Sequence, residues 1–119
     1  GVKVNCDAVR IEQVLANLLS NAAKYGAVND VIEVQVSNPE PSMVRVSVVD
    51  HGEGIAPHIR EKVFEKFVMA RTGKSGKVRS SGLGLSISKA IIEEHNGRIA
   101  FESRPGEGTT FYFNLPIVK

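Results

Sequence analysis

The segment that decides most about the fold lies near the start of the chain and reads Ile11-Glu-Gln-Val-Leu-Ala-Asn-Leu-Leu-Ser-Asn-Ala-Ala23. Its apolar residues recur every three or four positions over about three turns, which is the spacing of one face of an amphipathic helix. Asp7 is a suitable N-cap, and Gly26 stands where a helix commonly ends in a left-handed residue. The sequence therefore predicts a helix between Asp7 and Gly26.

Four other segments alternate apolar and polar residues with the period of two that is typical of β-strands. They occupy residues 31–36, 44–50, 98–103 and 109–115. The strands therefore come in two consecutive pairs. Residues 38–42 break the chain within the first pair, for which an antiparallel arrangement is the simplest, and Pro105-Gly-Glu-Gly108 supplies the turn of the second.

The chain between the two strand pairs combines helix and loop. Residues 59–67 predict a short helix, and residues 83–96 predict a second long helix. Residues 68–82 hold three glycines, three serines and four basic residues, which predicts a mobile loop. Strands that are grouped in pairs indicate an α+β fold, in which one mixed or antiparallel sheet carries helices on one face.

Composition excludes several classes of protein. The chain has 119 residues, of which 42% are hydrophobic and 24% charged, and this balance excludes a disordered tail or a collagen-like chain. A single cysteine excludes an internal disulfide and a multi-cysteine zinc site, and it fits a reducing compartment. The net charge of +2 gives no argument for binding nucleic acid. No apolar run approaches the ~18 residues that span a bilayer, and no signal peptide is apparent.

Three polar residues lie beside the apolar stripe of the first predicted helix. Asn17, Asn21 and Lys24 fall within about 60° of one another around the helix axis. Asparagine is unfavourable in a helix interior, so two of them one turn apart need a reason. One reason is a plain exposed face. The other is a site where an asparagine oxygen binds Mg²⁺ and the lysine neutralises a phosphate.

Two further segments combine glycines with a polar group. Asp50-His-Gly-Glu-Gly54 follows a strand directly. There the carboxylate can accept a hydrogen bond from an amino group such as that of adenine, while the glycines let the backbone approach a flat ligand. An ordinary Asp-initiated turn is the commoner explanation of such a string alone. Likewise Gly106-Glu-Gly-Thr-Thr110 is by default a hairpin turn, whose threonine can line a base pocket.

Glycines also open the last predicted helix, in Ser81-Gly-Leu-Gly-Leu85. A helix N-terminus presents unpaired N–H groups and the positive end of the helix dipole, which favours an anion. A purely steric role for the glycines is the alternative. The preceding loop strengthens the anion site, because its basic residues can fold over a triphosphate: Arg71, Lys74, Lys77 and Arg79.

In this order and at these distances the segments resemble the ATP-binding catalytic domain of bacterial sensor histidine kinases, in the GHKL or HATPase superfamily, over nearly the whole chain. The matching boxes are the N box at 17–25, the G1 box at 50–55, the F box at 64–67, the G2 box at 82–85 and the last strand at 108–116. The resemblance implies one domain, 1–119, with an α+β fold of the Bergerat type: a two-layer α/β sandwich with a mixed sheet, helices on one face, and a lid at about 68–81.

The resemblance also implies the roles of individual residues around ATP and Mg²⁺. Asp50 would bind the adenine amino group, with Tyr25 packing near the base. Asn21 would hold Mg²⁺, with Asn17 and Lys24 near the phosphates, and these three form the implied catalytic set. The implied nucleotide-binding set is completed by Gly52, Gly54, Ile55, Gly82, Leu83, Gly84, Leu85 and Thr109.

By the same resemblance, this cytoplasmic domain donates the γ-phosphoryl group of ATP to a histidine on a separate dimerisation domain of the same kinase, and a response regulator acts downstream. Contact with nucleic acid or membrane is not expected. In gyrase-type and chaperone-type relatives, a glutamate at the position of Asn17 activates water as a general base. The amide of Asn17 cannot take up a proton in this way. None of the three histidines lies in an H box, so the domain should not phosphorylate itself.

Two alternatives of the same fold stay open. Met69 stands where many family members carry an arginine, which favours a nucleotide-binding regulatory module that has lost catalysis. The other alternative is a serine kinase of the anti-sigma type.

Overall fold

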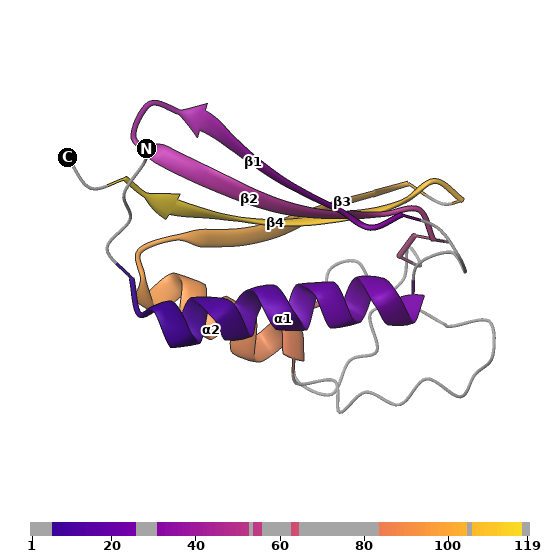
Figure 1. Ribbon diagram of the computed structural model, residues 1–119, viewed down its shortest axis with the longest axis horizontal. Coiled ribbons are helices and arrows are strands. Elements are labelled where there is room, and N and C mark those ends of the chain that lie inside the picture. The colour runs from indigo at the N-terminus through magenta and orange to yellow at the C-terminus, as the bar shows by residue number, and fades with distance from the viewer. Residues whose placement is uncertain are drawn as a thin grey trace.

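The structure is a computed structural model that describes residues 6–25, 31–52, 54–55, 63–64, 84–104 and 106–117. These residues form two layers, a four-stranded sheet and a pair of helices on one of its faces (Figure 1). The predicted α+β class with helices on one face is confirmed. In chain order the elements are α1 (Ala8–Tyr25), β1 (Glu33–Glu40), β2 (Met43–Asp50), α2 (Gly84–Glu94), β3 (Arg98–Arg104) and β4 (Gly108–Pro116).

The strands of the sheet lie in the order β1-β2-β4-β3, and all three neighbouring pairs are antiparallel. The implied mixed sheet is therefore corrected to an antiparallel one for the described strands. The physical reason is the connectivity, because β1–β2 and β3–β4 are hairpins, which must run antiparallel. The central pair, β2 and β4, then aligns the end of β2 with the start of β4, so that Asp50 pairs with Thr109.

The first hairpin differs from its predicted form. The strand predicted over 31–36 begins later and continues through Pro39 to Glu40, so that only Pro41 and Ser42 remain in the turn. β1 lies at an edge of the described sheet, where a proline without an N–H group is tolerated. The register shifts between Ser37 and Glu40, as at a β-bulge.

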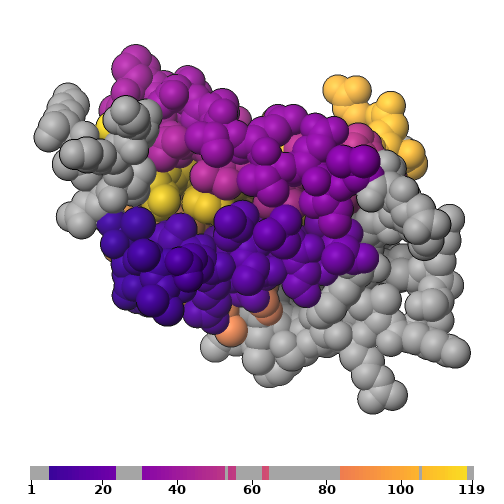
Figure 2. All heavy atoms as spheres, viewed as in Figure 1, coloured from indigo at the N-terminus to yellow at the C-terminus, as the bar shows by residue number. Residues whose placement is uncertain are grey.

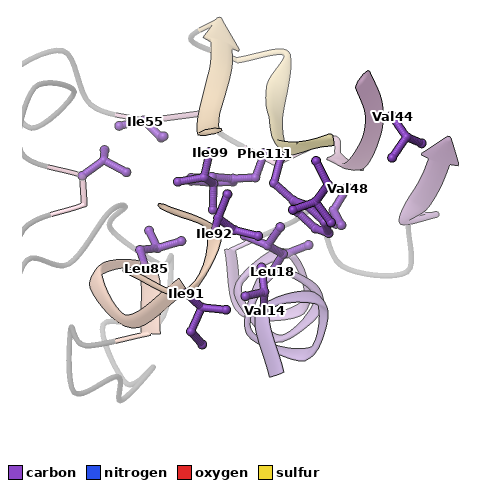
Figure 3. Packing of buried hydrophobic residues seen from close by; sticks show 14 residues of the cluster. Val14, Leu18, Val44, Val48, Ile55, Leu85, Ile91, Ile92, Ile99 and Phe111 are labelled. Atoms are coloured by element: carbon purple, nitrogen blue, oxygen red, sulfur yellow. The ribbon is translucent and has the colours of Figure 1, made fainter. Parts of the chain in front are cut away.

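The core lies between the helices and the inner face of the sheet. Both helices contribute buried apolar residues, and in Figure 3 Leu18 and Ile92 lie between these helices and Phe111. Phe111 also packs with Phe64 and Phe101, at ring-centroid distances of 6.2 and 5.7 Å. Figure 2 shows the two layers as atoms, with α1 below β1 and β2 and atoms of β4 visible between them. The helices are thereby fixed against the sheet.

The two helices are tied together at the end of the molecule opposite to the end of β2. The N–H of Asp7 donates to Nε2 of His95 at 3.0 Å, and Arg10 forms an ion pair with Glu94. Asp7 also caps α1, because its Oδ1 accepts from the N–H of Arg10 at 3.3 Å. The helix start predicted at Asp7 is therefore confirmed.

Asn96 and Gly97 have different roles at the end of α2. The left-handed residue at this helix end is Asn96, with φ of 59°. Gly97 is needed for a different reason. A Cβ at this position would lie 2.2 Å from the carbonyl oxygen of Asn114.

Some predictions lie outside the described residues: the lid at 68–81, Gly26, and the short helix at 59–67 apart from Val63 and Phe64. Val63 is 1% exposed and belongs to the core. Among the described residues, neither helix combines the length and the apolar character needed to cross a membrane.

Candidate functional site

The predicted segments lie toward one end of the molecule. Figure 1 shows that β2 and α1 end there and β4 begins there, whereas α2 begins nearer the middle of the molecule, below α1. Polar side chains on these elements fall into two groups. We call the group formed by Asp50, Ser103 and Thr109 the strand-end group, and the group formed by Asn17, Asn21 and Ser88 the helix group.

The strand-end group forms a single row across three strands. Thr109 on β4 pairs with Asp50 on β2 at one side and with Ser103 on β3 at the other. Directly opposite residues of antiparallel strands place their side chains on the same face. All three are buried, with exposed fractions of 2% for Asp50, 7% for Ser103 and 2% for Thr109.

Asp50 is held by the loop that follows it. Its Oδ1 accepts a hydrogen bond from the N–H of Gly52 at 3.0 Å, and Gly52 is itself buried. A buried carboxylate is costly unless hydrogen bonds compensate for the lost water. This contact contributes to that compensation and fixes the direction of the side chain. The result is an anchored acceptor at the end of β2.

Ser103 connects the loop after β2 to the β3–β4 hairpin. Its Oγ accepts from the N–H of Ile55 at 2.8 Å, donates to the carbonyl oxygen of Gly108 at 3.3 Å, and lies 3.0 Å from Oγ1 of Thr109. The sequence reasoning did not single out Ser103. Its only signal there was a small polar residue at a strand position whose neighbours on the same face, Ile99 and Phe101, are apolar.

Two glycines let the loop and the hairpin come this close. Gly54 has φ of +84°, and a Cβ on it would lie 2.8 Å from the carbonyl oxygen of Arg104. Gly108 has φ of +104°, and a Cβ there would lie 2.1 Å from the carbonyl oxygen of Asp50. Residues with a side chain rarely adopt either φ value. The missing side chain of Gly54 therefore makes room for the backbone of the β3–β4 hairpin at Arg104.

The helix group joins α1 to the first turns of α2. Nδ2 of Asn17 donates to the carbonyl oxygen of Gly84 at 3.3 Å and to Oγ of Ser88 at 3.2 Å. Ser88 is fully buried, with 0% of its surface exposed, and it was not among the predicted site residues. A Cβ on Gly84 would lie 3.8 Å from Cγ of Asn17, which is ordinary contact. Asn17 thus connects α1 to the first turns of α2.

Asn21 lies one turn further along α1 and has unused hydrogen-bonding capacity. Its Nδ2 is buried, yet it has no acceptor among the described residues. Leaving a buried donor without a partner costs roughly 1–3 kcal/mol. An oxygen atom of a bound ligand would satisfy it. Asn21 is therefore a candidate contact for a ligand oxygen.

The described side chains suit Mg²⁺ only if a bound phosphate group supplies further oxygen ligands to the ion. The described residues contain no cluster of three or more His, Cys, Asp or Glu residues that could hold a metal ion. Mg²⁺ keeps several waters and is commonly bound through one or two protein oxygens plus substrate phosphates. The amide oxygen of Asn21 fits this pattern as a single protein ligand.

The remaining predicted residues fall into two sets. The side chains of Ile55 and Leu85 belong to the core, with 1% and 8% exposed, so that only their backbone groups are available at the surface of the site. Lys24 and Tyr25 are the last residues of α1, and their side chains lie outside the description. Other candidates lie wholly outside the described residues: Gly82, Leu83, Met69 and the basic residues Arg71, Lys74, Lys77 and Arg79.

Comparisons with known proteins place the chain in a family. Residues 6–119 match the family model described as histidine kinase-, DNA gyrase B-, and HSP90-like ATPase. The sequence is 38% identical over 110 residues to the sensor histidine kinase AruS of Pseudomonas aeruginosa, with 90% of this chain and 11% of AruS covered. It is 36% identical over 115 residues to the adaptive-response sensory kinase SasA of Prochlorococcus marinus, with 96% of this chain and 30% of SasA covered.

Solved structures extend the similarity to the fold. The mycobacterial sensor histidine kinase MprB has a TM-score of 0.87 and 28% identity, with 98% of this chain and 78% of that chain covered. Full-length ShkA in complex with AMPPNP has a TM-score of 0.83 and 29% identity, with 100% of this chain and 24% of that chain covered. The chain therefore corresponds to a part of longer proteins, spanning 11% of AruS and 30% of SasA.

Proposed function

The chain belongs to the family of histidine kinase-, DNA gyrase B- and HSP90-like ATPases, and on this premise we propose that it is the ATP-binding catalytic domain of a sensor histidine kinase. In this proposal it binds ATP with Mg²⁺ and donates the γ-phosphoryl group to a histidine on a separate dimerisation domain of the same kinase. A response regulator then receives the signal. The domain acts in the cytoplasm, without contact with nucleic acid or membrane.

The observation that carries the proposal is the buried pair of Asp50 and Thr109, which the pairing of β2 with β4 places side by side. Asp50 is anchored by the N–H of Gly52, so its carboxylate is held ready to accept a hydrogen bond. An adenine amino group supplies a matching donor, and Gly52 leaves the edge of the loop without a side chain. We assign Asp50 to the base, with Thr109 beside it.

The helix group suits the phosphates. We assign Asn21 to the phosphate tail, where Nδ2 can donate to a phosphate oxygen and the amide oxygen can bind Mg²⁺. When bound, Mg²⁺ neutralises charge on the phosphates and orients them for transfer. The start of α2 at Gly84 and Leu85 presents backbone N–H groups to an anion. Lys24, Tyr25, Gly54, Ile55, Gly82 and Leu83 complete the proposed nucleotide-binding set.

Asn17 explains why the proposal is transfer to another domain rather than hydrolysis. Its Nδ2 is engaged with Gly84 and Ser88, and a neutral amide cannot take a proton from water. The chain therefore lacks a general base at this position of α1. The nucleophile must come from outside, as an acceptor histidine would.

The experiment that tests the proposal combines the chain with ATP, Mg²⁺ and a separately produced dimerisation domain that carries the acceptor histidine. We expect nucleotide binding and an acid-labile, base-stable phosphohistidine on the partner domain. The matched control is the same partner with that histidine replaced by glutamine. Nucleotide binding without phosphotransfer would instead favour the regulatory module, and an acid-stable phosphoserine would favour the serine kinase.

A further inference from the structure

We propose that Ser103 is a positioning residue that sets the direction of the Thr109 hydroxyl and thereby makes the base pocket prefer an amino group to a carbonyl group on the purine. The inference rests on the proposed function, because it takes Asp50 and Thr109 to face the base. It adds a specificity-determining residue on β3, a strand that carries none of the predicted site residues.

Ser103 makes three hydrogen-bond contacts through its hydroxyl group. A serine hydroxyl has one proton to donate and two lone pairs that accept. The N–H of Ile55 takes one lone pair, at 2.8 Å. We assign the Ser103 proton to the carbonyl oxygen of Gly108, which can only accept and lies 3.3 Å away. One lone pair of Ser103 remains.

Thr109 is the partner of Ser103 in the third of these contacts. Its Oγ1 lies 3.0 Å from Oγ of Ser103, within hydrogen-bond distance. Either hydroxyl could supply the proton of this contact. With the Ser103 proton assigned to Gly108, Thr109 donates to Ser103 and has no second proton to donate. Toward any other partner it presents lone pairs, as an acceptor.

Asp50 and Thr109 lie side by side in the strand-end group and together determine which hydrogen-bonding groups a base can place there. The Asp50 carboxylate accepts, and the Thr109 hydroxyl next to it is also turned into an acceptor. An amino group has two hydrogens to donate, whereas a carbonyl oxygen would face two acceptors. Burial keeps bulk water from compensating for such a mismatch, since both side chains are 2% exposed. The row therefore selects for the amino group.

Ser103→Ala is the variant that tests this role. Without Ser103, the hydroxyl of Thr109 is released to rotate and donate to a carbonyl oxygen. ATP and inosine triphosphate (ITP) are the probes, because ITP carries a carbonyl where ATP carries the amino group. We expect the wild-type chain to bind ATP more tightly than ITP, and Ser103→Ala to reduce this ratio on the order of tenfold.

The control variants separate this role from simple support of the fold. In a Thr109→Val background, the Ser103→Ala change should leave the ATP to ITP ratio unaltered, because no hydroxyl remains to be redirected. Ser47→Ala removes another buried serine, 8% exposed on β2, and should leave the ratio at the wild-type value. If Ser103→Ala does not fold, Ser103→Cys keeps the size of the side chain with a weaker acceptor and should reduce the ratio less.

The outcomes separate the inference from the proposed function. An equal loss of affinity for ATP and ITP in Ser103→Ala, with the ratio unchanged, would overturn the inference and leave ATP binding standing. A wild-type chain that binds neither nucleotide would overturn the proposed function, and the inference with it.

Discussion

The strand-end group and the helix group differ in how far the protein satisfies its own polar atoms. In the strand-end group, Ser103 makes three hydrogen-bond contacts within the protein, and Asp50 accepts from Gly52. In the helix group, by contrast, Asn21 keeps a buried N–H₂ without an acceptor in the described part of the chain. The comparison teaches that the proposed base pocket is formed in advance, whereas the proposed phosphate site is completed by its ligand.

This difference predicts that substitutions in the two groups affect different quantities, the free energy of unfolding in one group and nucleotide affinity in the other. Changes in or around the strand-end group should lower the free energy of unfolding, since they break contacts that exist without a ligand. At Asn21, a change should lower nucleotide affinity while sparing the fold. Asn17 is intermediate, because it belongs to the helix group but is already hydrogen-bonded to α2.

The largest effect on stability is expected for Gly108→Ala. The added Cβ would lie 2.1 Å from the carbonyl oxygen of Asp50, at φ of +104°. Strain and overpacking together should lower the free energy of unfolding by roughly 3–5 kcal/mol, measured by urea denaturation. Gly106→Ala is the matched control, because Gly106 also has positive φ, +77°, but nothing within 4 Å of the added atom. Equal losses in the two variants would contradict the close approach at Gly108.

A smaller loss of stability is expected for Asn17→Asp. The change removes the Nδ2 donor and sets a charged acceptor against the carbonyl oxygen of Gly84 and the hydroxyl of Ser88. The free energy of unfolding should fall by about 1–3 kcal/mol. The measurement is thermal or urea denaturation without nucleotide. The control is Glu12→Gln, a change at an exposed residue of the same helix. Wild-type stability in Asn17→Asp would show that the contact with α2 contributes nothing.

Asn21→Leu should have the smallest effect on the fold and a large effect on binding. Leucine is close to asparagine in shape and has no donor to leave unpaired, so the free energy of unfolding should stay constant or rise by up to about 1 kcal/mol. ATP affinity, measured by calorimetry in Mg²⁺, should fall sharply. A clear loss of stability in Asn21→Leu would contradict the proposed difference between the strand-end group and the helix group.

The sequence allowed the helices to be predicted well because their evidence is local. The apolar spacing around Leu18 and the cap at Asp7 place α1 within one residue of its observed bounds, Ala8–Tyr25. The same spacing puts Asn17 and Asn21 one turn apart on one face. The glycines after Asp50 mark the end of β2 for the same reason, since turn residues act over a few positions.

Ser103 and Ser88 could not be predicted because their roles depend on distant partners. Ser103 gains its function from the register of β3 with β4 and from Ile55 on the loop after β2, which no local pattern reveals. Ser88 is matched to Asn17 across a helix contact. The extension of β1 through Pro39 was missed because a proline marks a break unless the strand lies at an edge.

The most direct test of the central claim, that Asp50 reads the purine base, is a calorimetric titration of ATP into the wild-type chain and into Asp50→Asn. Asparagine has one acceptor oxygen, which the N–H of Gly52 uses, so its N–H₂ would face the base amino group. The account predicts an affinity lower by about 10- to 100-fold in Asp50→Asn, with Glu102→Gln binding ATP as the wild type does. Equal ATP affinity in Asp50→Asn and the wild-type chain would contradict it.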